Sequence, residues 1–177
     1  MATPKNIIDR VKEEFGCGLK NEKILELISS LEQRLSLEII RQTSIFNTKI
    51  NDETSLSMPY EENRITSLSI NGIRLSEGID YKTEGDTIFF REKQKGSVKI
   101  EYILLPEPFT IEDYMTRQLS LHDCYSDIYI FHILSRESLL NDDIERLNNY
   151  SALYSAALKG LISGYGKKTN ERFKKIW

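Results

Sequence analysis

The stretch RITSLSINGIRL, residues 64–75, decides how the middle of this chain folds. Asn71-Gly72 is a strong hairpin signal, because a type I′ turn needs positive φ at both of its central residues. With these two residues as the loop, two apolar pairs face each other on one side of the ribbon: Leu68 with Leu75, and Ile70 with Ile73. The stretch therefore predicts an antiparallel hairpin.

The alternation continues downstream of the hairpin. Residues 87–91 follow a Glu-Gly-Asp turn and carry Phe89 and Phe90, of which one should face inward. Lys95-Gly96 predicts another turn, and residues 98–104 again alternate apolar with charged side chains. We therefore expect a small antiparallel β-sheet or sandwich over residues 64–105.

Helical patterns flank this β segment on both sides. Thr3-Pro4 is typical of a helix start, and a second apolar stripe begins near Asn21. After the sheet, residues 110–113 have capping-box spacing and predict a helical pattern that runs through residue 132, with a break around Ser120-Leu121-His122 as the alternative to one continuous helix. Asn141-Asp142-Asp143 predicts the start of a last helix, which Gly164 and Gly166 should end.

The predicted fold class is therefore α+β, a helical bundle with an inserted small antiparallel sheet. The expected segments are N-terminal helices (1–42), a polar loop (43–63), the β-domain (64–105), C-terminal helices (106–164) and a basic, aromatic tail (165–177). A polar loop of this length is a candidate for contact with a neighbouring protein, with a flexible loop as the alternative.

Composition and charge exclude several classes of protein. The chain has 177 residues and a formal net charge of −3, whereas a domain that coats nucleic acid is usually strongly basic. We find no signal-peptide pattern and no apolar run of membrane-spanning length, so we expect assembly in a cytoplasm and no membrane partner. The two cysteines, Cys17 and Cys124, are expected to be reduced.

No residue pattern predicts catalysis, a metal or a cofactor. His122 and His132 lie ten residues apart, about 15 Å along a helix, which is too far for two ligands of one ion. The glycines at 16, 18, 160, 164 and 166 fit neither a dinucleotide fingerprint nor a P-loop. We expect the chain not to be an enzyme and to need no cofactor.

The tail from residue 165 onward differs from the rest of the chain. It combines five basic residues and one acid with aromatic side chains, and such mixtures are typical of interface hot spots. A solvated tail, or one folded back on its own core, is the alternative. The residues expected to bind a partner are Tyr165, Lys167, Lys168, Arg172, Phe173, Lys174, Lys175 and Trp177.

The order of these parts resembles the head-to-tail adaptor (connector) proteins of tailed bacteriophages. The resemblance spans nearly the whole chain. The residues that carry it are Met58-Pro59-Tyr60, the segment 65–72, Asp80-Tyr81, the strand 98–102, the polar break 141–143 and the start of the last helix at 145–150.

The resemblance implies a structural subunit of the virion neck, assembled in the host cytoplasm. Such adaptors form a ring, typically a homododecamer, beneath the portal vertex, where they extend the DNA channel and dock the next neck or tail protein. On this reading, the partners are the portal protein, a downstream neck or tail protein and other copies of the chain. The tail would clamp the portal, and DNA would pass without specific binding, which suits an acidic body.

Two other functions remain open at this point. The β-domain would act as a virion binding module for another protein or a glycan if exposed aromatic side chains gathered on it. A nucleic-acid-binding role for the basic tail would show as strongly salt-dependent DNA affinity.

Overall fold

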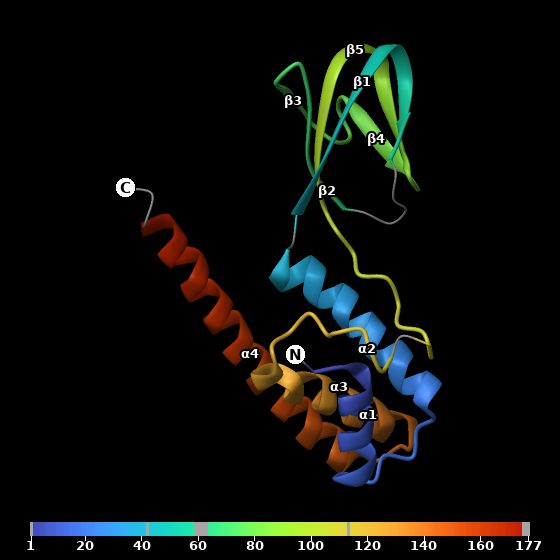
Figure 1. The fold of residues 1–177 in the computed structure, drawn as a ribbon, viewed down its shortest axis with the longest axis vertical. Coiled ribbons are helices and arrows are strands. Elements are labelled where there is room, and N and C mark those ends of the chain that lie inside the picture. Colours follow the sequence, from blue (N-terminus) through green and yellow to red (C-terminus); the bar gives the residue numbers. More distant parts are fainter. Residues whose placement is uncertain (1, 42, 59–63, 113, 175–177) are drawn as a thin grey trace. The chain divides into compact units, whose positions relative to one another are not determined.

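The chain folds into two compact units, seen in a computed structural model that describes residues 2–41, 43–58, 64–112 and 114–174 (Figure 1). Side chains are described as far as Gly164. The helical unit combines residues 1–35 with residues 106–177, and the β unit comprises residues 36–105. The described residues form four α-helices and a five-stranded antiparallel sheet, so the fold class is α+β, as predicted.

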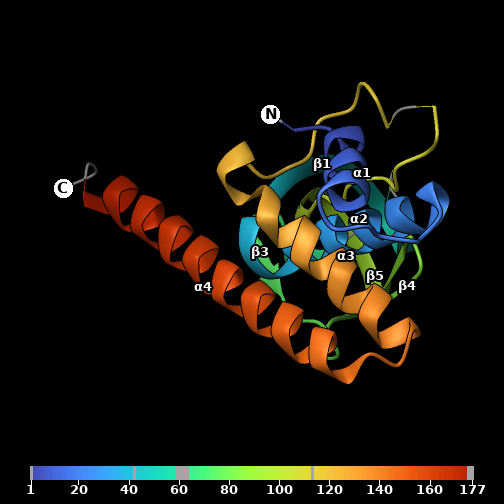
Figure 2. The same ribbon diagram turned by 90° about the horizontal axis from the view of Figure 1, so that it is seen from below.

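The helical unit is built around one central helix. It contains α1 (Pro4–Glu13), α2 (Asn21–Leu35), α3 (Ser126–Leu140) and α4 (Ile144–Lys174). Buried side chains lie on all sides of α3, which packs against the other three helices (Figure 2). The predicted start of α1 is confirmed: the Thr3 hydroxyl accepts a hydrogen bond from the Asn6 backbone N–H, and Pro4 is the first helical residue.

The helical pattern predicted from Thr110 to His132 is wrong over residues 110–122 and confirmed from Ser126 onward, where α3 begins. Residues 106–122 form an irregular coil up to a short 3-10 turn, η2 (Asp123–Tyr125), and Asp113 of the expected capping box lies outside the described residues. The coil is held by tertiary hydrogen bonds instead: Lys5 N–H donates to Tyr114 O (3.1 Å), and Leu119 N–H donates to Ala2 O (3.0 Å). These bonds satisfy backbone groups that a helix would have paired locally.

The start of helix α4 agrees with the prediction, whereas its end does not. Its predicted start is confirmed, because Asp143 Oδ1 accepts a hydrogen bond from the Arg146 backbone N–H (3.0 Å). Its predicted end at Gly164 is wrong, since the helix continues to Lys174. Gly164 faces the Tyr125 hydroxyl so closely that a Cβ would collide with it. This glycine therefore serves close packing within a helix.

The β unit is one curved sheet with the strand order β1-β5-β2-β3, in which β4 also pairs with β5. A π-helical turn, η1 (Ser36–Ile40), precedes it. The strands are β1 (Thr43–Ser57), β2 (Arg64–Ile70), β3 (Ile73–Leu75), β4 (Tyr81–Glu84) and β5 (Thr87–Ile103). The predicted hairpin is confirmed in register, and both turn residues, Asn71 and Gly72, have positive φ. The sheet encloses an apolar core of its own that includes Leu68, Ile88 and Ile100.

The polar stretch predicted as a loop over residues 43–63 is a strand over most of its length. β1 pairs with β5 along both halves, with a bulge near Asp52. Alternate residues of its first half are more buried, ending at Ile50, while the others face solvent. An edge strand of this kind needs few apolar residues, because its partner strand supplies the hydrogen bonds and most of the core. Residues 59–63 lie outside the described part.

The turn predicted at Lys95-Gly96 is also absent, since β5 runs through it as a single strand. The Asn71 side chain lies over Gly96: its Oδ1 accepts from Ser97 N–H (3.0 Å) and its Nδ2 donates to Lys95 O (3.1 Å). Gly96 has a φ of 137°, and a Cβ there would overlap the Asn71 amide. The Asn71-Gly72 turn and Gly96, which the sequence analysis treated as two separate turns, therefore lie in contact with each other.

We expect Gly96→Ala to destabilise the β unit by about 2 kcal/mol, because strained backbone and a displaced Asn71 act together. Amide hydrogen exchange of β1, β2 and β5 measures this loss. Gly85→Ala is the matched control: Gly85 has a φ of 61° with open space around it, so only the backbone strain applies, about 1 kcal/mol. Equal effects of the two changes would contradict the role given to Asn71.

Candidate partner-binding surfaces

Helix α4 is the most exposed helix of the helical unit. It has 31 residues and would be about 46 Å long. Among the described side chains of α4 only Leu161 is fully buried, and α3 is its main packing partner. Figure 2 shows its last turns extending away from the rest of the helical unit. A long helix held along one part of its length offers surface for another protein.

The predicted partner-binding residues fall at this end of the chain. Six of them lie in the last turns of α4: Tyr165, Lys167, Lys168, Arg172, Phe173 and Lys174. Lys175 and Trp177 lie outside the described residues. The structure therefore brings six predicted residues onto one helix, and its backbone presents them beyond the contact of Gly164 with Tyr125.

Exposed apolar side chains gather where α3 meets α4, a feature that the sequence did not predict. Leu139, Leu140 and Ile144 are exposed around the Asn141-Asp142-Asp143 turn, and Ile144 is 70% exposed. The available signal was the apolar pair Leu139-Leu140, which forms the last two residues of α3.

A groove next to these leucines runs between α2, α3 and α4, and we call it the basic groove. It consists of two hollows of about 440 and 190 Å³ that share Arg34, His132, Arg136 and Leu139. Arg136 is exposed, and among the described residues nothing forms a hydrogen bond or ion pair with it. Arg34 lies 5.9 Å from the centre of the Tyr154 ring on α4. The groove therefore combines positive charge with apolar walls.

His132 is the buried polar group of this groove. It is 6% exposed, its ring centre lies 5.5 Å from that of Tyr154, and its Nε2 has no hydrogen-bond partner among the described residues. Burial, together with the smaller effect of the charges of Arg136 and Arg34, lowers the pKa of His132 to about 4. The imidazole is therefore neutral at pH 7, with one ring nitrogen available to donate a hydrogen bond.

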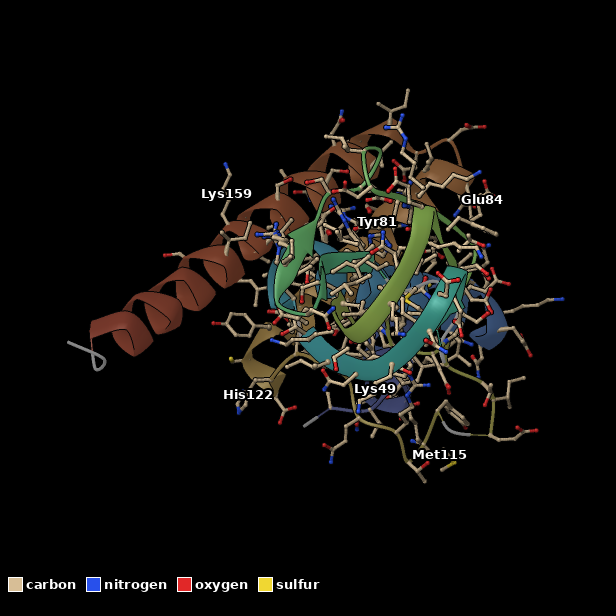
Figure 3. All side chains as sticks on the ribbon, turned by 90° about the horizontal axis from the view of Figure 1, so that it is seen from above. Lys49, Tyr81, Glu84, Met115, His122 and Lys159 are labelled. Carbon is tan, nitrogen blue, oxygen red and sulfur yellow. The ribbon has the colours of Figure 1, made fainter. Side chains whose placement is uncertain are left out.

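The β unit carries a smaller apolar surface. Phe90 is buried and Phe89 is 36% exposed, so the prediction that one of the pair faces inward is confirmed. Lys82 Nζ lies 5.5 Å from the Phe89 ring centre, and Ile79 is exposed beside it in a hollow of about 260 Å³. Figure 3 looks down on this sheet, with Tyr81 labelled. The surface provides one exposed aromatic ring.

His122, Cys17 and Cys124 lie outside the basic groove. His122 Nδ1 accepts a hydrogen bond from Cys124 N–H (3.4 Å) and so caps η2. Cys17 is buried, and burial raises the pKa of its thiol, while Cys124 is exposed; both are free. Within the described part of the chain, no group of three His, Cys, Asp or Glu residues is arranged to hold a metal ion.

No protein-family model matches the chain, and no curated protein sequence matches it. Among the described helices, none is both long and apolar enough to cross a membrane.

Proposed function

We propose that this chain is a structural subunit of a bacteriophage neck, which forms a homo-oligomeric ring that joins the portal to the tail and extends the DNA channel. The proposal rests on the order of parts that resembles head-to-tail adaptors. The observation that carries it furthest is α4, which is mostly exposed and ends in the basic, aromatic segment. A helix of this kind suits docking onto a large partner, because its aromatic and arginine side chains are those that dominate interface energies.

The exposed leucines at the turn between α3 and α4 also support a protein-binding role. Exposed apolar side chains that gather in one place are typical of interaction surfaces. A ring subunit needs such surfaces for its neighbours in addition to the one that binds the portal.

We expect a variant that ends at Gly164 to form rings but to bind the portal at least about thirtyfold more weakly, since a hot spot contributes about 2 kcal/mol or more. The shortened chain should fold, because the last described packing contact of α4 is that of Gly164 with Tyr125. Native mass spectrometry and negative-stain imaging of the full and shortened chains, each alone and with the portal protein of the same genome, measure both properties.

Two full-length variants divide the effect between charge and aromatic contact. One replaces Lys167, Lys168, Arg172, Lys174 and Lys175 by glutamine, and the other replaces Phe173 and Trp177 by alanine. Unchanged portal binding by the shortened chain would remove the clamp from the proposal. A full-length chain that forms no ring, alone or with the portal, would contradict the neck function itself.

The second candidate function is a β-domain binding module, favoured by the surface around Phe89 and Ile79. This function predicts that Phe89→Ala abolishes binding of a virion protein or glycan while leaving ring formation unchanged. A glycan array and a pull-down with neck and tail proteins separate it from the adaptor function.

A further inference from the structure

The coil of residues 106–122 presents a second surface on the helical unit, opposite in character to the basic groove. Ile111 and Met115 are 58% and 54% exposed, and Glu112 between them is exposed as well. We call Ile111, Glu112 and Met115 the acidic knuckle. It joins apolar side chains to negative charge, whereas the basic groove joins apolar side chains to positive charge.

The coil on either side of the knuckle is held by contacts of Phe109 and Arg117. The Arg117 guanidinium lies 4.3 Å from the centre of the Phe109 ring and donates hydrogen bonds to the carbonyls of Pro108 and Glu107. Phe109 is buried, and its N–H donates to Ser29 Oγ on α2 (2.8 Å). A surface ordered in advance loses less conformational entropy on binding.

The two surfaces are separate on one molecule, with Ser30 of α2 bordering both the basic groove and the hollow that Ile111 lines. Figure 2 shows the coil on the side of the helical unit away from α4, and the label of Met115 in Figure 3 agrees with this. The basic groove is lined by α2, α3 and α4. Two different surfaces that fit each other between copies give a head-to-tail contact, which repeats and closes into a ring when the rotation allows.

We propose that the basic groove of one copy binds the acidic knuckle of a second copy of this chain, a contact that rests on the proposed ring. The Glu112 carboxylate pairs with the exposed Arg136 guanidinium. Ile111 and Met115 cover the exposed Leu139 and Leu140. This gives the unpaired Arg136 charge and four exposed apolar side chains their partners.

Opposite charge reversals test the contact. Arg136→Glu and Glu112→Arg should each weaken self-association at least about tenfold, because like charges then face each other across the interface. A 1:1 mixture of the two variants should assemble again, since every groove then finds a knuckle of opposite charge. Sedimentation velocity and native mass spectrometry measure the assembly, and circular dichroism checks the fold of each variant.

Lys20→Glu and Glu13→Arg are the matched controls, because both residues are exposed and lie outside the groove and the knuckle. If both reversals assemble like the unaltered chain, or if their mixture does not assemble, the contact is wrong while the ring stands. If the unaltered chain self-associates through this contact into open chains only, the contact stands and the ring function is wrong. A chain that never self-associates overturns the contact.

Discussion

Replacing Glu32 by alanine should lower the free energy of unfolding of the helical unit by about 3 to 4 kcal/mol, since hydrogen bonds to a charged group are each worth roughly 1.5–3 kcal/mol. Glu32 is 1% exposed on α2, and its carboxylate accepts three hydrogen bonds. The donors are the Ser120 backbone N–H (3.0 Å), the Ser120 hydroxyl and the Tyr129 hydroxyl.

This carboxylate connects three parts of the helical unit that are distant in sequence: α2, the coil at Ser120 and α3 at Tyr129. Alanine removes the acceptor and leaves buried donors without a partner, which costs more than the loss of an exposed bond. Urea denaturation followed by circular dichroism measures the change. Hydrogen exchange should also show the Ser120 amide losing its protection.

Glu26→Ala is the matched control for Glu32→Ala. Glu26 lies on the same helix and pairs with Lys23 (2.6 Å), but both side chains are exposed. Its loss should change stability by only about 0.5 kcal/mol, the usual range for a surface ion pair. Similar effects of the two changes would show that the Glu32 hydrogen bonds contribute little.

Lowering the pH from 6.5 to 4 should destabilise the helical unit by about 3 kcal/mol through His132 alone. The folded pKa is about 4, below the ordinary value of 6.5, so the unfolded chain binds the proton more readily. Stability is therefore fully present above pH 6.5, falls as the pH drops toward 4, and falls no further from this group below pH 4.

The charged and polar groups that face His132 come from all three packed helices: Arg34 on α2, Arg136 on α3 and Tyr154 on α4. Stability measured by urea denaturation between pH 4 and 8 gives the profile. His132→Leu should flatten the step between pH 6.5 and 4, since leucine does not titrate. His122→Leu, at an exposed position, should keep it. A step that survives in the His132 variant would assign it to other groups.

Local signals in the sequence were sufficient for several elements. The Asn71-Gly72 turn set the hairpin register, because the turn type demands positive φ at two adjacent residues and only such residues adopt it cheaply. Thr3-Pro4 and Asp143 set two helix starts, because a cap satisfies backbone N–H groups within one turn of the chain. Each of these signals acts over a few residues.

The errors arose where a distant segment decides the local conformation. β1 is a strand because β5 pairs with it, although its own polar residues predict a loop. The coil of residues 106–122 stays irregular because Glu32, Ser29 and the N-terminal residues bind its backbone. Gly96 sits within a strand, and Gly164 within a helix, because Asn71 and Tyr125 occupy the space that a Cβ would fill.

The sequence alone predicts one of the candidate binding surfaces, whereas the other two appear only in the structure. The basic, aromatic end of the chain is visible in composition alone, because charge and residue type need no neighbours to be recognised. The basic groove and the acidic knuckle are not, since Arg34, His132 and Arg136 come together only through the packing of α2 against α3 and α4. By itself the sequence determined the turns, the caps and the charge of the chain's end, which depend on adjacent residues. Only the tertiary structure decided which polar groups are buried, paired or left available to a partner, because burial depends on segments far apart in the chain.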